Sequence, residues 1–285
     1  MKFKKILNYL KLKFSINNSF NLKNISSLDN IKKNSIIFYE GNNLESINKK
    51  IKNKKNIILI LNKKLYTKYK YNKILSTNPR ITFYKIVDYL FLKKFLIQRF
   101  KTNNKFYSKN IDPSSKIGNN VSIGKNVKIG KNCSIDNCKL GNNTIISDNC
   151  VIGNSGFGFI KYRKKLIHNP HYGNVIIGNN SYVGPLTNIE RGHIDDTIIG
   201  DDVKIDSLVQ IGHNCSINRF SIITAGSILC GNVKIGKNVF IGVNTCIKER
   251  QIVRDNVIIG AGSNVINSLH LNQTYFGNPA KVYIK

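Results

Sequence analysis

The sequence predicts a mainly β protein, in which a parallel β-helix follows a small N-terminal α/β domain. The first observation behind this prediction is an aliphatic residue that recurs every six positions over residues 199–265. The second is a small or β-branched residue four places after most of these. A short strand, a turn and another short strand give this period, whereas a helix repeats every 3.6 residues and a simple strand every two. Three such units make one triangular coil.

The same repeat occurs in two earlier blocks. Its aliphatic positions there are Ile117, Ile123, Ile129, Ile135, Leu140, Ile146, Ile152, Ile177, Val183 and Ile189. Each coil is expected to pair its backbone with the coils on either side and to stack its aliphatic side chains inside. Because a stacked array accommodates an insertion only as a loop that leaves through a corner, residues 153–174 are expected to form an excursion from a β-helix over residues 106–285.

The N-terminal segment, residues 1–105, has a different pattern. The apolar spacing over residues 3–14 suits an amphipathic helix. Residues 35–43 and 56–62 are typical of strands, and residues 78–96 are typical of a helix that follows an Asn-Pro pair. Together these segments predict a small α/β domain.

The six cysteines form neither a dense disulfide framework nor a CxxC metal pair. Cys133, Cys150 and Cys215 occupy repeat positions that require a small residue, so we expect them to be buried for packing. The histidines lack the spacing of metal ligands, and we expect no bound metal.

The formal net charge of +30 is extreme, so anionic partners must be considered. The lysines are scattered singly among Asn and Ile, however, which favours a general bias in residue usage. A nucleic-acid reader should show a helix-turn-helix, a zinc pattern, or Arg interleaved with exposed aromatic residues, and we find none of these. We therefore expect no nucleic-acid partner, while attraction to phosphates or to an acidic carrier protein stays open.

The first residues do not resemble a signal peptide, because Asn and Lys interrupt the apolar positions of “MKFKKILNYLKLKF”. The aliphatic run at residues 57–61 is far shorter than the roughly 20 residues needed to cross a bilayer. We expect a cytoplasmic protein with at most peripheral membrane contact.

Several segments carry a resemblance to a known family. They are “ISSLDNIKKNSIIFYEGNN” (25–43), “NPRITFYKIVDYLF” (78–91), “IDPSSKIG” (111–118), “GFGF” (156–159), “GNVIIGNN” (173–180), “NIERGHIDDTIIGDDVKIDSLVQIGHN” (188–214) and “GNPAKV” (278–283). Together they resemble the UDP-3-O-(3-hydroxyacyl)glucosamine N-acyltransferases of lipid A (lipopolysaccharide) biosynthesis, which are hexapeptide-repeat acyltransferases. The resemblance implies a left-handed β-helix for residues 106–285 and a uridine-binding domain for residues 1–105.

The resemblance also implies a reaction and an assembly. The enzyme would move a 3-hydroxyacyl chain from acyl carrier protein to the 2-amino group of a UDP-3-O-acylglucosamine. The donor is carried on phosphopantetheine, and no bound cofactor is expected. The sites would lie between neighbouring β-helices of a homotrimer, an assembly that suits flat faces able to bury one another around a threefold axis.

His213 is the expected general base. It lies two residues after the inward-facing Ile211, at a coil corner. A histidine that titrates near neutrality is suited to removing a proton from the acceptor ammonium, and the resemblance places the family's proposed base in this “QIGHN” string. The alternative is a solvated histidine on a turn.

Two residues are expected to assist His213. Asp206, seven residues earlier, could fix the imidazole tautomer, as a carboxylate does in a hydrolytic triad, or could be a plain corner residue. A coil has about 18 residues, so Gly231 should stack one coil beyond His213. Its backbone N–H is a candidate donor to the oxyanion, and the resemblance places the family's oxyanion amide there.

The uridine-binding segment departs from the family pattern of Phe followed by Asn-Pro-Lys-Tyr. Phe38 is present, but “YEGNNL” replaces the rest. Phe38 could stack on uracil, with Tyr39 or Asn42 substituting for the missing groups. Alternatively, Phe38 is a core aromatic residue on a strand.

Four further residues are candidates for substrate binding. Phe157 and Phe159 of the “GFGF” segment could form apolar walls over the sugar, or the loop could pack on its own coil. Gln210 belongs to the His213 string. Arg250 stands where many family members have a second histidine, and an arginine could clamp a phosphate but could not act as a base near neutral pH.

The remaining histidines receive less specific assignments. His168 and His171 lie on the excursion among several basic residues and could contact phosphates. His193 and His270 receive no assignment.

Two alternative functions stay open. One is an acetyl-CoA-dependent N-acetyltransferase that acts on an amino-sugar nucleotide for surface polysaccharide, which the early C-terminus, Arg250 and the altered uridine segment favour. The other is a non-catalytic β-helix scaffold that binds anions through its charge.

Overall fold

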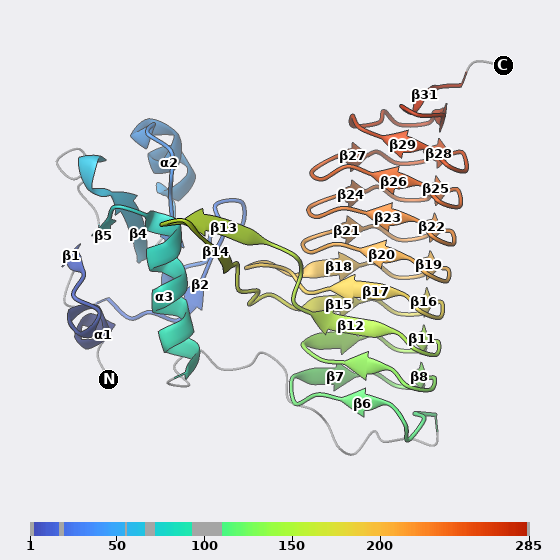
Figure 1. Cartoon of the computed structure of the whole chain (residues 1–285), viewed down its shortest axis with the longest axis horizontal. Coiled ribbons are helices and arrows are strands. Elements are labelled where there is room, and N and C mark those ends of the chain that lie inside the picture. The colour runs from blue at the N-terminus through green and yellow to red at the C-terminus, as the bar shows by residue number, and fades with distance from the viewer. Residues whose placement is uncertain (1–2, 17–19, 55, 66–71, 93–109, 284–285) are drawn as a thin grey trace. The chain divides into compact units, whose positions relative to one another are not determined.

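The computed structural model describes residues 3–16, 20–54, 56–65, 72–92 and 110–283 (Figure 1). The chain forms two compact units that divide after residue 97, and each is described here by itself. The predicted boundary after residue 105 lies outside the described residues.

The N-terminal unit is a five-stranded sheet in the order β1-β5-β4-β3-β2. Its strands are β1 (Lys13–Ser15), β2 (Asn24–Ile25), β3 (Ser35–Phe38), β4 (Ile57–Asn62) and β5 (Lys73–Ser76). The helices are α1 (Phe3–Tyr9), α2 (Leu44–Ile51) and α3 (Pro79–Leu92), with a short 3-10 turn η1 (Lys63–Leu65). All strand pairs are parallel except β1 with β5, so the predicted α/β organisation is confirmed.

One helix boundary and one whole helix in this unit differ from the sequence prediction. The first helix ends at Tyr9 rather than near residue 14, because Lys11 adopts a left-handed conformation with φ 52° and the chain turns into β1. The second difference is α2, which the sequence did not predict. Its N-terminus is capped by Asn43, whose side-chain oxygen accepts hydrogen bonds from the backbone N–H groups of Glu45 and Ser46 at 3.0 and 3.1 Å.

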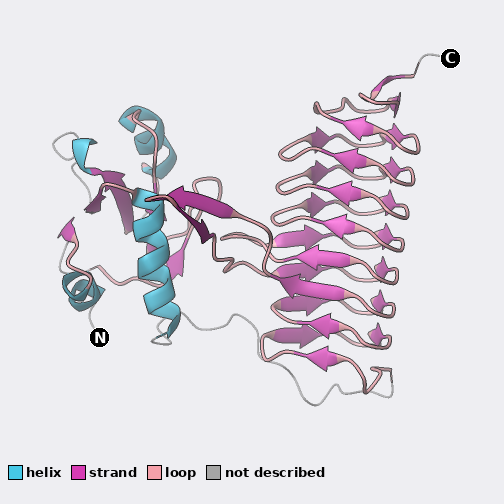
Figure 2. Cartoon of the chain, viewed as in Figure 1, coloured by secondary structure: helices cyan, strands magenta, loops and turns pink. Residues whose placement is uncertain are grey.

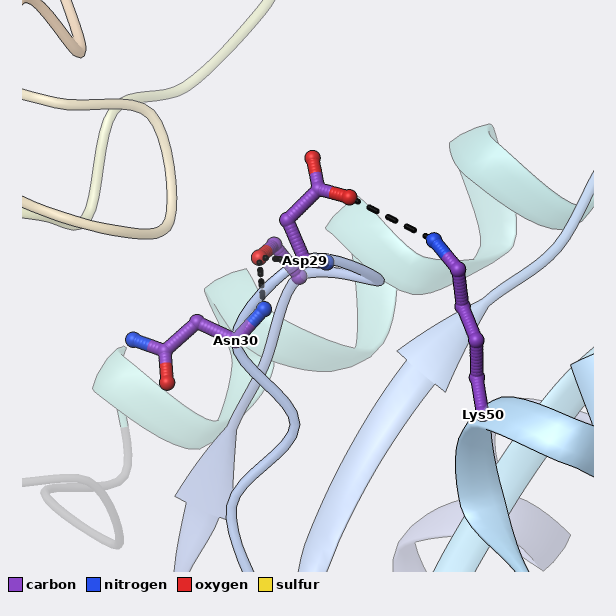
Figure 3. Close-up of polar contacts among 4 residues, drawn as sticks. Asp29, Asn30 and Lys50 are labelled. Carbon is purple, nitrogen blue, oxygen red and sulfur yellow. Dashed lines mark hydrogen bonds and ion pairs between the residues drawn. The ribbon is translucent and has the colours of Figure 1, made fainter.

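A surface ion pair joins α2 to the loop before β3 (Figure 3). Lys50 Nζ lies 3.4 Å from Asp29 Oδ1, and the next residue, Asn30, donates its backbone N–H to the Ser27 hydroxyl at 3.1 Å. The Asp29 side chain is 93% exposed, so this pair contributes little to stability.

The C-terminal unit is a parallel β-helix with three long sheets (Figure 2). The seven-stranded sheet contains β7 (Val121–Ile123), β10 (Cys138–Leu140), β15 (Val175–Ile177), β18 (Thr197–Ile199), β21 (Ser216–Ile217), β24 (Lys234–Ile235) and β27 (Ile252–Val253). The eight-stranded sheet contains β6 (Lys116–Ile117), β9 (Ser134–Ile135), β12 (Val151–Asn154), β17 (Asn188–Glu190), β20 (Gln210–Ile211), β23 (Ile228–Leu229), β26 (Cys246–Ile247) and β29 (Asn264–Val265).

The nine-stranded sheet completes the triangular section. It contains β8 (Lys128–Ile129), β11 (Ile145–Ile146), β16 (Tyr182–Val183), β19 (Lys204–Ile205), β22 (Ile222–Ile223), β25 (Phe240–Ile241), β28 (Ile258–Ile259), β30 (Thr274–Phe276) and β31 (Lys281–Val282). Neighbouring coils pair in parallel, and β31 alone among these strands pairs antiparallel, with β30.

The repeat positions form the core of the β-helix, as predicted. The aliphatic residues that stack from coil to coil, such as Ile205, Ile211 and Ile217, are almost completely buried. Cys133, Cys150 and Cys215 are buried free thiols at the small positions. Burial of one aliphatic side chain contributes roughly 1.5–3 kcal/mol, and each ladder repeats that contribution along the helix.

The corners explain much of the asparagine content. The second corner position has a positive φ in most coils and is occupied by Asn126, Asn132, Asn143, Asn149, Asn180, Asn214, Asn232, Asn238, Asn244, Asn256 and Asn272. Asparagine tolerates this left-handed conformation better than other non-glycine residues. The side chains also bond coil to coil, since Asn126 donates to Asn143 at 3.1 Å and Asn143 to Asn180 at 3.0 Å. What looked like a usage bias therefore has a structural role.

The predicted excursion leaves the β-helix after β12 and returns at β15 (Figure 1). It carries an antiparallel hairpin of β13 (Phe159–Tyr162) and β14 (Lys165–His168). Both turn residues, Arg163 and Lys164, have positive φ, which is the geometry of a tight two-residue hairpin turn. Within the residues described, no helix has the length and apolar character needed to cross a bilayer.

Candidate functional site

One edge of the β-helix gathers the predicted catalytic residues. We call it the His213 edge, and it consists of the corners that follow β12, β17, β20, β23 and β26 of the eight-stranded sheet. His213 follows β20, Gly231 follows β23, and Arg250 follows β26. Because these strands pair in register, the corners after them stack in the same order.

Gly231 lies against the His213 ring, as the 18-residue count predicted. The pairing of Ile211 with Leu229 places His213 beside Gly231. A Cβ atom on Gly231 would lie 2.7 Å from His213 Nε2 and 2.9 Å from its Cε1, so a side chain at residue 231 would displace the imidazole. Among the described residues, the Gly231 N–H has no hydrogen-bond acceptor. Its role as an oxyanion donor stays a prediction.

The hydrogen bonds of Asn214 fix the tautomer of His213. Asn214 Oδ1 accepts the backbone N–H of His193 at 2.9 Å, and Asn214 Nδ2 donates to the carbonyl of Asp195 at 3.0 Å. The amide orientation is therefore determined by unambiguous backbone partners. His213 Nδ1 lies 3.1 Å from the same Oδ1, so Nδ1 must carry the hydrogen. Nε2 is then the basic atom, and it is the ring nitrogen that faces Gly231.

The predicted contact between Asp206 and the His213 ring is wrong within this chain. Asp206 Oδ1 accepts the backbone N–H of Ser207 at 2.7 Å. The physical reason is the spacing: Asp206 lies at the corner before β20, whereas His213 lies at the corner after it. Asn214, the neighbour of His213, takes the role assigned to Asp206.

Glu190 is a site residue that the sequence analysis missed. Its Oε2 accepts the backbone N–H of His213 at 3.1 Å, and its Oε1 accepts a hydrogen bond from Gln210 at 3.2 Å. Asn188 donates to Gln210 Oε1 at 2.8 Å, so the Gln210 side chain is held at the edge beside the carboxylate. This placement is compatible with the substrate-binding role predicted for Gln210, which stays a prediction.

The ring of His171 contacts His213, and the rings of His193 and His168 contact His171 in turn. The His171 ring centroid lies 5.3 Å from that of His213 and 5.4 Å from that of His193. His168 lies 5.9 Å from His171 on the exposed side of the excursion. His171 itself is only 6% exposed, which argues against the predicted phosphate contact. His193, which received no assignment from the sequence, belongs to the site.

Burial lowers the pKa of His171 to about 4, and the neighbouring charges of His213 and His168 act in the same direction. Its imidazole is therefore neutral near pH 7. The neutral ring can lie beside His213 without adding a second positive charge.

Glycine at residue 156 allows the excursion to reach the site. A Cβ atom there would lie 2.6 Å from Glu190 Oε2, 2.9 Å from His171 Nε2 and 3.1 Å from His213 Cβ. The fold-back that the “GFGF” segment predicted is therefore present. Phe157 and Phe159 contact each other with centroids 5.2 Å apart and are 83% and 49% exposed. Their role as walls over a sugar stays a prediction.

Arg250 occupies a strained position on the His213 edge. Its φ is 63°, where most corners have asparagine or glycine, and its side chain is exposed. The left-handed conformation costs roughly 1–2 kcal/mol for a residue with a long side chain. Its backbone N–H donates to the Gly231 carbonyl at 3.1 Å, which places residue 250 in the corner stacked next to that of Gly231.

The predicted uridine-binding residues lie at the end of β3 in the N-terminal unit. The Phe38 ring packs against Phe83 at 5.1 Å and lies under the guanidinium group of Arg80 at 5.6 Å. The Tyr39 hydroxyl donates to the carbonyl of Asn43 at 2.8 Å, so it is used within the loop. Asn42 is exposed. Phe38 packs on the core residue Phe83 but is itself half-buried, so both alternatives for Phe38 stay predictions.

Among the described residues, no group of three or more His, Cys, Asp or Glu side chains has the geometry of a metal site. The site supplies a base, an unpaired backbone donor and a nearby carboxylate. This set can remove a proton from a nucleophile and stabilise an oxyanion.

Comparisons with known proteins show which proteins this chain is similar to. A model of the GMPPB C-terminal domain matches residues 106–160. A relative from Arabidopsis thaliana, “Probable UDP-3-O-acylglucosamine N-acyltransferase 2, mitochondrial”, is 34% identical over 148 residues, which are 52% of this chain and 49% of that protein. The chain therefore matches about half the length of this curated relative.

Solved structures share the fold. LpxA from Acinetobacter baumannii superposes with a TM-score of 0.52 at 21% identity, covering 61% of this chain and 74% of that one. A UDP-N-acetylglucosamine acyltransferase gives a TM-score of 0.52 at 26% identity, covering 61% and 73%. These likenesses confirm the left-handed parallel β-helix. With the relative above, they support the broader group of the resemblance, the hexapeptide-repeat acyltransferases.

The low pKa of His171 predicts a pH dependence of stability. The unfolded chain binds this proton near pH 6.5, the folded chain only near pH 4, so stability is complete above about pH 6.5 and falls as the pH drops toward about 4. The His171→Gln variant should lose less unfolding free energy across this window than the parent does. Urea unfolding at several pH values measures this. His270→Gln, at an exposed histidine, is the control, and equal pH slopes in the parent and His171→Gln would contradict the prediction.

Proposed function

We propose that the chain is an N-acyltransferase that moves a 3-hydroxyacyl group from acyl carrier protein to the 2-amino group of a UDP-3-O-acylglucosamine. One observation carries the proposal: His213 Nε2, left unprotonated by the Asn214 hydrogen bond, lies against Gly231, whose amide has no acceptor among the described residues. The identity to a relative named as an N-acyltransferase of this kind supports the choice of substrate.

The reaction follows from these two groups. The acceptor ammonium first loses one proton to solvent, and the resulting amine attacks the thioester carbonyl. His213 takes the proton released as the new C–N bond forms, while the Gly231 N–H donates to the tetrahedral oxyanion. Cleavage of the C–S bond then gives the amide, and His213 returns its proton to the departing thiolate of phosphopantetheine. Glu190 accepts the backbone N–H of His213 and so helps to fix the corner that carries the base.

A homotrimer completes the proposal. The nine-stranded sheet exposes the large apolar side chains Ile145, Tyr182, Ile222, Phe240 and Ile258, with Lys204 between Tyr182 and Ile222. Aligned apolar residues on a flat sheet face are suited to burial against another copy of the chain. The proposed compartment is the cytoplasm, although the relative from Arabidopsis thaliana has “mitochondrial” in its name.

The hairpin of the excursion supports an acidic partner. Lys161, Arg163, Lys164 and Lys165 are exposed on it, and the sequence has no acidic residue between positions 148 and 190. The base of the same excursion contacts His213 through Gly156. A carrier protein with an acidic surface would therefore dock beside the site.

Transfer from a coenzyme A thioester to an amino-sugar nucleotide is the second candidate. The exposed guanidinium group of Arg250 on the His213 edge favours it, because arginine grips phosphates in a bidentate fashion. The two candidates differ in the donor that supports turnover.

The first prediction concerns the donor and the base. With a UDP-3-O-acylglucosamine acceptor, the purified protein should turn over a 3-hydroxyacyl carrier protein, and His213→Ala should lower kcat by about 10²–10⁴-fold. His270→Ala, at the exposed histidine, should leave kcat unchanged. Turnover with acetyl coenzyme A alone would favour the second candidate. Retention of activity within about threefold in His213→Ala would remove the base assignment, and absence of turnover with either donor would favour a scaffold.

The second prediction concerns the hairpin. A variant of the hairpin changes Lys161, Arg163, Lys164 and Lys165 to Gln. It should raise KM for the carrier-protein thioester by about tenfold and leave unchanged the KM for a small thioester that lacks the carrier protein. A matched variant with Lys125, Lys128, Lys131 and Lys237 changed to Gln removes the same charge from exposed coil positions. An equal rise in KM in both variants would attribute the effect to net charge rather than to the hairpin.

A further inference from the structure

His171 is packed against the proposed base from the end of the excursion. Its ring is 6% exposed and meets the His213 ring in a T-shaped arrangement, with an interplanar angle of 66°. On another side it meets His193 at 73°. The buried His171 ring therefore fills the space beside His213 and limits how far the His213 imidazole can swing.

Hydrogen bonding does not explain the burial of His171. Its Nδ1 atom is buried and has no hydrogen-bond partner among the described residues. A buried polar atom without a partner costs roughly 1–3 kcal/mol, so the buried Nδ1 atom of His171 lowers the free energy of unfolding. What His171 supplies to its neighbours is the shape and contact of a flat ring.

The chain around Gly156 closes the other side of the packing. A side chain there would collide with the His171 ring and crowd the His213 side chain at its base, since its Cβ would lie 2.9 Å from His171 Nε2 and 3.1 Å from His213 Cβ. The excursion thus presses directly on both histidines. The His213 ring is then confined between His171 and Gly231, with the Asn214 hydrogen bond at its Nδ1 atom.

We propose that His171 is a positioning residue for acyl transfer: its buried ring, packed against His213, holds that imidazole with Nε2 against Gly231. This inference rests on the proposed function. A single hydrogen bond at Nδ1 leaves the ring free to tilt, and a misplacement of about 1 Å in a catalytic group can cost about 10²-fold in rate. Ring packing removes that freedom.

The charge state of His171 agrees with this role. Because burial lowers its pKa to about 4, the ring stays neutral while His213 cycles through its protonated form. The other titratable or charged groups around His171 are Glu190, His168, His193 and Arg191, and of these only Glu190 is acidic. A cationic side chain at residue 171 would oppose protonation of His213.

Three variants separate ring packing from hydrogen bonding. His171→Phe keeps a flat ring and removes both nitrogens, so we expect its kcat to stay within about threefold of the parent value. His171→Ala removes the ring, and we expect kcat to fall by about 10–100-fold with KM for the acceptor nearly unchanged. His270→Ala is the matched control and should match the parent.

A second readout does not depend on activity. The nuclear Overhauser effect between the His213 ring protons and the Gly231 Hα protons should persist in His171→Phe and weaken strongly in His171→Ala. If His171→Ala does not fold, His171→Leu replaces it, with the same expected loss. Failure of the parent to turn over either donor would reject the proposed function, while the Overhauser comparison would still decide the position of the ring.

Two results would overturn the inference. Parent-like kcat and a parent-like Overhauser effect in His171→Ala would show that His171 does not position His213. A fall in kcat in His171→Phe as large as that in His171→Ala would show that a ring nitrogen, rather than packing, carries the effect.

Discussion

Parallel backbone pairing between successive coils is the constraint on which the rest of this structure depends. It fixes the register of each strand to its neighbours, so residues about one coil apart lie side by side. His213 reaches Gly231 on one side and Glu190 on the other through this register alone. A slip of one residue would turn the buried aliphatic ladder outward, so the core that stabilises the fold also holds the site in place.

The six-residue period predicted most of the β-helix. Period, corner and coil length together located the three sheets, the buried thiols and the excursion after β12. Counting one coil from His213 predicted its neighbour, Gly231, because residues one coil length apart stack on each other in a regular β-helix. The asparagine corners could also have been predicted, since a left-handed residue at each turn favours asparagine or glycine.

The repeat length could not predict side-chain contacts within a corner. Asp206 was expected to orient His213 because both flank β20, yet they lie at opposite ends of that strand and Asn214 takes the contact. Nor does a period describe an excursion, so it gave no signal that residues 169–174 would return His171 to the site. The close glycine at residue 156 was the available hint, because glycine permits approach of one backbone to another group. In the N-terminal unit, Asn43 was an available local signal for the start of α2, because its side chain caps that helix.

The proposed chemistry depends on which nitrogen of His213 carries the hydrogen. Backbone partners fix the Asn214 amide, the amide places the hydrogen on Nδ1, and Nε2 is left as the proposed base beside Gly231. Long-range ¹H–¹⁵N correlation spectra of the ¹⁵N-histidine-labelled protein, recorded at a pH where His213 is neutral and assigned with His213→Gln, test this directly. The account predicts a protonated Nδ1 and an unprotonated Nε2. A hydrogen on Nε2 would contradict it, because the atom beside Gly231 could not then accept the proton of the acceptor.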